Sequence, residues 1–242
     1  GMGSDDLTSI ETAYLKGGNG DNRLDASAFS GDVTLIGVGG ADTLKGGSGN
    51  DMLNGRSGAD SITGGDGDGY GIGGNHFTHT ARRNTDLTYI VMNNQIYGLT
   101  TGQVSPTSSL GMQTKSTPHG SVEYPLNPLT SAIMNGATFV ARGFSGDIRG
   151  LTSLMTRGIK HKGFALIDIF SPCVTFNLEN DHAFFKTRIK KLEDVGHDPS
   201  DWKAACERAM AWGDEIFTGL FFERDDRISL DEAEPILKGG PP

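Results

Sequence analysis

Acidic and amide side chains stand on either side of one apolar segment, at positions that suit a bound metal ion. Gly65-Asp66-Gly67 is separated by 25 residues, 68–92, from Asn93-Asn94. Asp66 offers a carboxylate, Asn94 an amide oxygen and Ile96 a backbone carbonyl. Mg²⁺ prefers octahedral coordination by oxygen, and glycine lets the backbone approach a ligand closely. These residues predict a magnesium site with Asp66, Asn94 and Ile96 as its protein ligands.

The segments around these residues indicate how such a site is held. The apolar run Leu87–Met92 is typical of a buried strand that ends at Asn93. Both ligand segments are expected at the carboxyl ends of parallel strands, where open α/β sheets bind their ligands. The patterns predict strands over 88–92, 137–142 and 164–170, helices over 70–83, 127–135, 147–160, 181–192 and 201–212, and a long loop over 99–126.

Two other glycine and aspartate patterns in the same segment are weaker. Gly69, Gly71 and Gly74 match a dinucleotide-binding fingerprint, but no apolar strand precedes them. A calcium loop starting at Asp66 would place Phe77 at its twelfth position, where a glutamate is needed. A glycine-rich turn next to an unrelated asparagine pair is the remaining alternative. The combination of both halves at this spacing favours the magnesium site.

The 25-residue spacing resembles the motif of thiamine diphosphate-binding enzymes. This resemblance implies that the cofactor's diphosphate and a water complete the coordination of Mg²⁺. It also implies that Gly65, Gly67 and Asp68 contact the diphosphate. His76 is a further candidate for cofactor contact, with a purely structural histidine as the alternative.

A longer part of the chain resembles the β subunit of 2-oxoacid:ferredoxin oxidoreductases. The similarity runs over roughly residues 65–235. It is carried by Gly74-Asn75-His76-Phe77, Arg82-Arg83-Asn84, residues 97–107, Phe139-Val140-Ala141-Arg142-Gly143, residues 161–168, residues 171–177 and Trp212-Gly213-Asp214.

The resemblance implies an enzyme that oxidatively decarboxylates a 2-oxoacid to an acyl-coenzyme A and passes electrons to ferredoxin. Leu99 and Thr101 are then expected to face the reactive thiazolium ring. The implied partners are an α subunit, ferredoxin, coenzyme A and the 2-oxoacid, and the implied location is the cytoplasm. In the family, another domain supplies the carboxylate that activates the cofactor, so we expect no turnover by this chain alone.

The cysteines depart from the family pattern. The β subunit holds a [4Fe–4S] cluster through four cysteines, of which three lie before the Gly-Asp-Gly motif, and only Cys173 matches here. The other cysteine, Cys206, falls on a predicted helix. A cluster of this kind takes four thiolates, so Cys173 is expected to be an orphan ligand and the cluster is not expected in this chain.

The front of the chain is an array of nine-residue repeats. Units beginning at Gly37, Gly46 and Gly55 share glycine at positions 1 and 4, aspartate at position 6 and an aliphatic residue at position 8, and a degenerate copy spans 17–25. The pattern resembles the RTX calcium-binding repeat, which implies a short parallel β-roll that binds Ca²⁺ through Asp42, Asp51 and Asp60. A flexible linker would not keep aliphatic residues in step with such a period.

Composition separates the chain into the same two parts. Residues 1–65 hold 16 of the 36 glycines, and the formal net charge of the 242 residues is −9. An acidic chain is a poor partner for a nucleic-acid backbone, and no apolar run approaches the length of a membrane span. We expect two domains, a β-roll over 1–64 and a thiamine diphosphate-binding domain over 65–242 that lacks its N-terminal part.

The expected fold is therefore α/β, an incomplete parallel-sheet domain preceded by the β-roll. In the family a hydrophobic strand leads into the Gly-Asp-Gly motif, but here the last repeat occupies that place with Asp60 and Ser61. This segment is expected to be a poor substitute for a buried strand. The leading hypothesis is the oxidoreductase β subunit. One alternative is a calcium-binding repeat protein with an inert enzyme remnant, and another is a chain that folds poorly.

Overall fold

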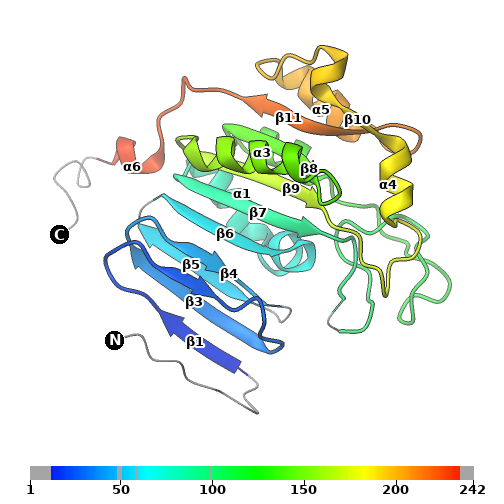
Figure 1. Ribbon diagram of the computed structural model, residues 1–242, viewed down its shortest axis with the longest axis horizontal. Helices are drawn as coiled ribbons and strands as arrows, with labels where there is room; N and C mark the ends of the chain where they lie inside the picture. The colour runs from blue at the N-terminus through cyan, green and yellow to red at the C-terminus, as the bar shows by residue number, and fades with distance from the viewer. Residues whose placement is uncertain (1–11, 48–50, 58, 99, 235–242) are drawn as a thin grey trace.

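The repeats at the front of the chain form two layers of short parallel strands. The computed structural model describes residues 12–47, 51–57, 59–98 and 100–234. One layer holds β1 (Thr12–Lys16), β3 (Asp32–Gly39) and β5 (Met52–Ser57), and the other holds β2 (Arg23–Asp25), β4 (Thr43–Lys45) and β6 (Asp60–Gly65). Successive repeats alternate between the layers, as the blue strands of Figure 1 show. The predicted parallel β-roll is confirmed.

The aliphatic residue of each repeat explains this coil. Leu35 lies opposite Leu53 in one layer, and Leu44 lies opposite Ile62 in the other. Leu35, Leu44 and Ile62 are buried in one cluster, against which Leu53 packs. One repeat therefore makes half a turn of the coil, and two repeats bring the chain back to the same layer.

The rest of the chain forms an α/β structure whose sheet continues the layer made by β2, β4 and β6. A single eight-stranded sheet has the order β10-β11-β8-β9-β7-β6-β4-β2. Its further members are β7 (Leu87–Asn93), β8 (Phe139–Phe144), β9 (Phe164–Phe170), β10 (Ile189–Lys191) and β11 (Ile216–Glu223). All neighbouring pairs are parallel except β11 with β8.

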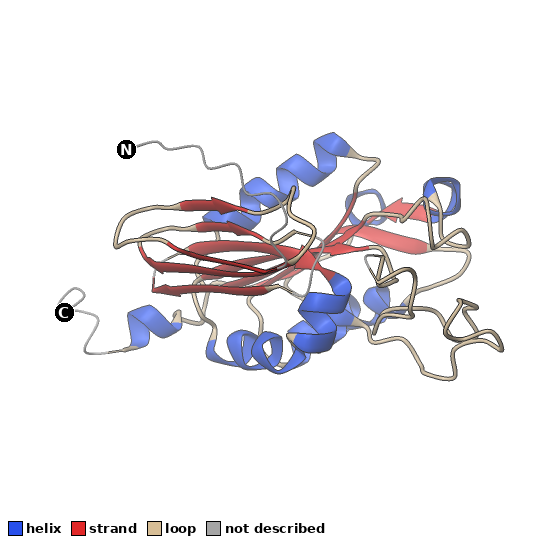
Figure 2. Cartoon of the chain, turned by 90° about the horizontal axis from the view of Figure 1, so that it is seen from below, coloured by secondary structure: helices blue, strands red, loops and turns tan. Residues whose placement is uncertain are grey.

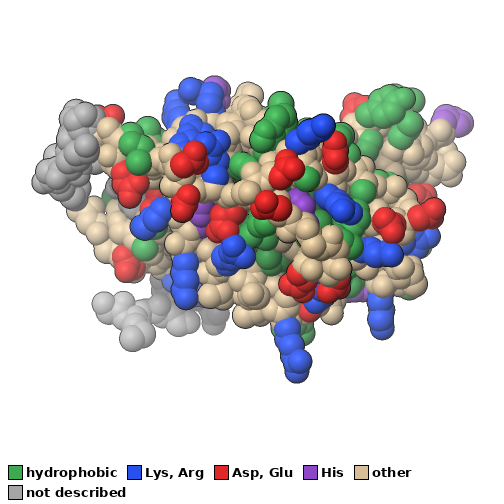
Figure 3. All heavy atoms as spheres, turned by 90° about the horizontal axis from the view of Figure 1, so that it is seen from above, with side chains coloured by type: hydrophobic (Ala, Val, Ile, Leu, Met, Phe, Trp, Pro, Cys, Tyr) green, Lys and Arg blue, Asp and Glu red, His purple; other side chains and the backbone are tan. Residues whose placement is uncertain are grey.

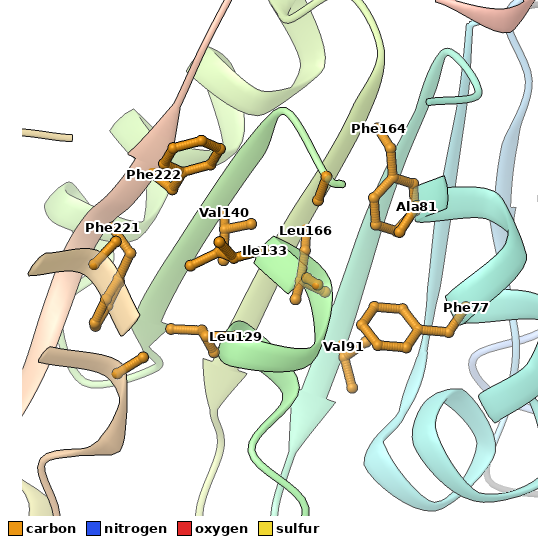
Figure 4. Packing of buried hydrophobic residues seen from close by; sticks show 14 of the residues in the cluster. Phe77, Ala81, Val91, Leu129, Ile133, Val140, Phe164, Leu166, Phe221 and Phe222 are labelled. Carbon is orange, nitrogen blue, oxygen red and sulfur yellow. The ribbon is translucent and has the colours of Figure 1, made fainter. Parts of the chain in front are cut away.

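Helices cover both faces of this sheet, as Figure 2 shows with the strands nearly edge-on. The main core joins side chains of α1 (Gly74–Arg83), α2 (Pro128–Met134) and α5 (Trp202–Met210) to β7, β8, β9 and β11. Figure 4 shows this cluster, with Phe77 of α1 beside Phe164 of β9. A second cluster places α3 (Ile148–Lys160) against the opposite face.

The seam between the two parts differs from the expectation. The last repeat was expected to replace a buried strand poorly, yet β6 pairs with β7 over six positions, from Asp60↔Leu87 to Gly65↔Met92. Asp60 is buried, and its Oδ1 accepts the backbone N–H of Asp42 at 2.9 Å, which offsets part of the cost of burying this carboxylate. The carboxylate that was expected to disrupt the strand thus links it to the preceding turn of the coil. The proposed division at residues 64 and 65 falls inside β6.

The elements predicted for the second part fit the structure, with a few additions. The strands over 88–92, 137–142 and 164–170 correspond to β7, β8 and β9. The helix predicted over 70–83 is split into a π-helical turn, η1 (Gly67–Ile72), and α1, and that over 181–192 contains α4 (His182–Arg188), β10 and the start of a 3₁₀ turn, η2 (Leu192–Val195). β11 and α6 (Leu230–Ala233) were not predicted.

The buried carboxylate of Asp60 makes stability depend on pH. Burial raises the pKa of Asp60 from 3.8 to about 6, so the folded state holds more protons than the unfolded state between these values. The free energy of unfolding should therefore fall as the pH rises from about 4 to about 6. In urea unfolding with a chelator present, Asp60→Asn should reduce this fall by on the order of 2 kcal/mol. An unchanged pH profile would contradict the assignment.

Candidate functional site

The structure brings the two predicted metal-binding segments together. Asp66 follows the last residue of β6, and Asn94 follows the last residue of the adjacent parallel strand β7. The backbone N–H of Asn94 donates to Asp66 Oδ1 at 3.2 Å. The Asn94 side-chain oxygen accepts the N–H of Ile96 at 3.0 Å, which folds the turn back over the strand end.

The Asp66 carboxylate is buried among polar groups. Its side chain is 1% exposed, and its Oδ2 accepts the Thr107 hydroxyl at 2.7 Å. Burial raises the pKa of Asp66, while hydrogen bonds from Ser105 and Thr107 act in the opposite direction. Within the described ranges no basic side chain forms an ion pair with it. A buried carboxylate beside an amide oxygen and backbone carbonyls is a donor set that fits Mg²⁺.

Gly67 is required by close packing at the start of η1. A Cβ at Gly67 would lie 2.1 Å from Cε1 of Tyr97. The Tyr97 hydroxyl donates to the Gly67 carbonyl at 3.1 Å. This contact ties the turn after β7 to the segment that carries Asp66. Gly65, by contrast, is the last residue of β6, and a Cβ there would lie 3.2 Å from Asp68 Oδ2.

Asp68 and His76 were also expected to contact the cofactor. Both line a cavity of about 460 Å³ between the roll strands β5 and β6 and helix α1. Asp68 Oδ2 accepts the N–H of Gly65 at 3.3 Å, and burial raises the pKa of Asp68 to about 6. The His76 side chain is exposed. Their predicted contacts with the cofactor stay predictions.

The two residues expected at the thiazolium ring lie in the turn after the asparagine pair. Leu99 is outside the described residues. Thr101 is exposed, with a positive φ of 74°, and its N–H donates to the Gly98 carbonyl at 3.2 Å. Tyr97 and Gln103 form an antiparallel β-bridge across this turn. Figure 1 shows the long green loop and the segment after β9 at this same end of the sheet.

The two cysteines occupy separate places. Cys173 follows β9, and its Sγ accepts the N–H of Phe176 at 3.4 Å. Cys206 lies in α5 against the main core, where burial raises the pKa of its thiol. Among the described residues, no three His, Cys, Asp or Glu side chains are grouped for a metal ion.

The three aspartates of the repeats occupy equivalent positions in the coil. Oδ1 of Asp42 accepts the N–H of Asn22 at 2.8 Å, and Oδ1 of Asp51 accepts that of Val33 at 3.0 Å. Like Asp60, each of these carboxylates therefore joins its own turn of the coil to the preceding turn. Among the described residues, the second oxygens of Asp42 and Asp51 are buried and have no hydrogen-bond partner. Such oxygens fit the carboxylate-rich coordination that Ca²⁺ takes.

Glycine at the first position of each repeat makes room for these carboxylates. A Cβ at Gly37, Gly46 or Gly55 would lie only 2.0, 2.3 or 2.0 Å from the carboxylate oxygen of the aspartate in the same repeat. The glycine and the aspartate of a repeat are thus one structural unit. This explains why both recur with the same period.

The site also contains buried polar residues that the sequence-based prediction does not include. Asp168 is fully buried in β9 and forms an ion pair with Arg142 of β8, with 3.2 Å between Oδ2 and Nε. Asn93 and Thr107 lie between this pair and Asp66. One signal was available, because Asp168 is the single charged residue in the apolar run Phe164–Phe170.

Three family models match successive parts of the chain. Residues 58–169 match the C-terminal TPP binding domain of thiamine pyrophosphate enzymes, and residues 173–238 match the C-terminal part of the pyruvate ferredoxin oxidoreductase beta subunit. Residues 36–70 match the RTX calcium-binding nonapeptide repeat. The thiamine pyrophosphate enzyme match and the RTX repeat match overlap over residues 58–70, which contain β6 and Asp66.

Individual relatives point the same way. A 2-oxoacid:ferredoxin oxidoreductase subunit beta of Saccharolobus solfataricus is 42% identical over 168 residues, covering 65% of this chain and 55% of that protein. The 2-oxoglutarate oxidoreductase subunit KorB of Mycobacterium tuberculosis is 48% identical over 127 residues, covering 52% of this chain and 33% of that protein. The chain thus spans about half the length, or less, of these curated relatives.

A solved structure extends the similarity to most of the chain. It is a 2-oxoglutarate:ferredoxin oxidoreductase from Magnetococcus marinus with 2-oxoglutarate, coenzyme A and succinyl-CoA bound. The TM-score is 0.72 at 32% identity, covering 96% of this chain and 78% of that chain. The fold and the matched residues place the chain among α/β proteins that contain the thiamine pyrophosphate enzyme domain. More particularly, the chain belongs to the 2-oxoacid:ferredoxin oxidoreductase β-subunit family, with an RTX repeat segment fused at its front.

The face of the molecule in Figure 3 carries no large patch of side chains of one charge. Lys and Arg side chains are interspersed there with Asp and Glu. Searching the described residues also finds no helix with the length and apolar character to cross a membrane.

The packing at Gly67 gives a direct test of the site's geometry. Gly67→Ala should lower the free energy of unfolding by about 1–3 kcal/mol, because the added methyl overlaps the Tyr97 ring. Gly74→Ala is the matched control, since a Cβ there meets nothing within 4 Å and lies in helix α1. Its effect should stay within about 1 kcal/mol in either direction. Equal effects in urea unfolding would contradict the packing described here.

Proposed function

We propose that this chain binds Mg²⁺ and thiamine diphosphate as the β subunit of a 2-oxoacid:ferredoxin oxidoreductase. The observation that supports this most directly is the meeting of Asp66 and Asn94 at the ends of two paired parallel strands. The Asp66 carboxylate, the Asn94 side-chain oxygen and the Ile96 carbonyl would hold the metal. Thiamine diphosphate held there would supply the nucleophilic carbon needed to decarboxylate a 2-oxoacid.

The residues of this chain would contribute the fixed positions of the metal ligands. Asp66 is fixed through both oxygens, and Tyr97 holds the turn that carries Asn94 against Gly67. Asn177 donates from its side chain to the Asn94 carbonyl at 3.0 Å, which binds the segment after β9 to the same turn. Such preorganisation is what the protein adds to chemistry that belongs to the cofactor.

The proposal extends to partners of the whole enzyme. By similarity to its relatives, the chain would act in the cytoplasm with an α subunit, ferredoxin, coenzyme A and a 2-oxoacid. The Magnetococcus relative holds 2-oxoglutarate and coenzyme A. Because the family's activating carboxylate comes from another domain, the isolated chain should show no 2-oxoacid-dependent reduction of viologen. We also expect no [4Fe–4S] cluster with Cys173 as its only matching ligand.

Calorimetric titration of thiamine diphosphate, with and without Mg²⁺, tests the cofactor proposal. The chain should bind the cofactor only when Mg²⁺ is present. Asp66→Asn should abolish this binding while leaving the protein at least as stable, because burial already disfavours the charged Asp66 carboxylate.

Asp226→Asn removes the same charge from a solvent-exposed position and is the control for that titration. It should bind like the wild type. A wild-type chain that binds no cofactor with Mg²⁺ would contradict the proposed function. Unchanged binding by Asp66→Asn would instead contradict the ligand assignment.

A second function, calcium binding by the repeats, is favoured by the buried second oxygens of Asp42 and Asp51, which have no hydrogen-bond partner within the part of the chain that the structure describes. We propose that Ca²⁺ bound at these aspartates and Asp60 stabilises the roll. If its Kd is about 10⁻⁴–10⁻³ M, as in extracellular calcium modules, 5 mM Ca²⁺ should add about 1–2 kcal/mol of stability.

Thermal unfolding with Ca²⁺ and with a chelator measures this stabilisation. The double variant Asp42→Asn/Asp51→Asn should lose it. Asp198→Asn, an exposed position remote in sequence from the repeats, should keep it. Equal calcium responses of the two variants would count against this calcium site.

A further inference from the structure

The Thr107 side chain joins the Asp66 carboxylate to the end of β7. Its hydroxyl lies 2.7 Å from Asp66 Oδ2 and 2.9 Å from Asn93 Oδ1. All three side chains are buried, with exposed fractions of 3% or less. Asp66 Oδ1 accepts the N–H of Asn94. The carboxylate is therefore oriented at both oxygens by protein donors.

A buried ion pair sets the orientation of Asn93. The Asn93 amide nitrogen donates to Asp168 Oδ1 at 2.9 Å, and the Tyr70 hydroxyl donates to the same oxygen at 2.9 Å. Arg142 Nε donates to the other oxygen at 3.2 Å. A carboxylate only accepts hydrogen bonds, so the amide nitrogen must face Asp168. The Asn93 oxygen consequently faces Thr107.

The backbone of Thr107 is held by the turn that carries the metal ligands. Gln95 Nε2 donates to the Thr107 carbonyl at 3.1 Å, and the Ser108 hydroxyl donates to the Gln95 carbonyl at 2.6 Å. Asn180 donates to the Gln95 side-chain oxygen at 2.9 Å. This part of the long loop is thus anchored beside Asn94 by buried hydrogen bonds.

The Thr107 hydroxyl has one proton and two possible acceptors, Asp66 and Asn93. A hydroxyl donates a single hydrogen bond, and an ionised acceptor makes the stronger one. The Asp66 contact is also the shorter of the two. The Thr107 proton is therefore directed to Asp66 when this carboxylate is charged, while Asn93 and the Ser105 hydroxyl, 3.3 Å away, complete the surroundings of the Thr107 oxygen.

We propose that Thr107 is a positioning residue for the metal-binding carboxylate, and that the buried hydrogen bond from Gln95 to its carbonyl holds it in that role. This inference rests on the proposed function, because it concerns the Mg²⁺ and thiamine diphosphate site. Thr107 stands 41 positions after Asp66 and outside the Gly-Asp-Gly and Asn-Asn pattern. Thr107 would act through its hydrogen bond to Asp66, not by contact with the cofactor.

A matched pair of substitutions isolates the hydroxyl. Thr107→Val keeps the branched shape but removes the donor to Asp66, whereas Thr107→Ser keeps the donor and loses a methyl group. Loss of an outer partner of a metal ligand typically costs 10–100-fold in metal affinity. Titration of Mg²⁺ in saturating thiamine diphosphate should show about 10–100-fold weaker binding for Thr107→Val, and a change within about threefold for Thr107→Ser.

Unfolding of each variant in urea, with a chelator present, separates positioning from stability. A merely structural role would lower the unfolding midpoint of Thr107→Val and leave its Mg²⁺ affinity unchanged, which would overturn the inference. Equal losses of affinity in the valine and serine variants would also overturn it. If Thr107→Val does not fold, Thr107→Ala removes the same hydroxyl with a smaller side chain and carries the same expectation.

The two proposals fail in different ways. A wild-type chain that does not bind Mg²⁺ with thiamine diphosphate overturns the proposed function and this inference with it. Wild-type binding together with unaltered affinity in Thr107→Val overturns the inference alone. Weakened binding in the valine variant, restored by serine, supports both.

Discussion

The parallel pairing of β6 with β7 is the interaction on which the rest of the molecule depends. It makes one continuous sheet from the coil of repeats and the α/β layers. It also sets Asp66 next to Asn94, because each follows directly on one of the paired strands. The hydrogen bonds of this ladder depend on the backbone, so a strand of repeat origin can make them as well as an apolar strand can. Side chains then need only be compatible with burial, which Ile62 satisfies directly and Asp60 satisfies through its bond to Asp42.

Buried carboxylates are the recurring cost of this arrangement. Asp42, Asp60, Asp66 and Asp168 are all nearly inaccessible to solvent, and only Asp168 has a basic partner, Arg142, in the described part of the chain. The others are stabilised by backbone and hydroxyl donors, which satisfy polarity without supplying positive charge. A divalent cation would provide that charge. The two metal sites suggested by the family resemblances therefore coincide with the places where the protein's own electrostatics are least balanced.

Much of this could be predicted from the sequence, and the part that could not has clear physical reasons. The nine-residue period revealed the roll because glycine, aspartate and aliphatic residues recur in fixed order. The segments ending at Asn93 and at Phe170 were predictable because buried parallel strands are continuous apolar runs. The ability of β6 to pair with β7 was underestimated, because the sequence shows that Asp60 carries a carboxylate but does not show which backbone N–H donates to it. Thr107 lies in a long loop, and its contact with Asp66 depends on loop closure that no local pattern encodes.

The coil in which successive strands alternate between two layers leaves its two ends in different situations. β4 and β6 lie in the layer that continues into the large sheet, while β5, between them in sequence, lies in the other. The final strand is fixed by its pairing with β7, whereas β4 is paired with the strand 18 residues further on, as Leu44 is with Ile62. A repeat gained or lost upstream of β4 would therefore change the length of the coil and leave Asp66 beside Asn94.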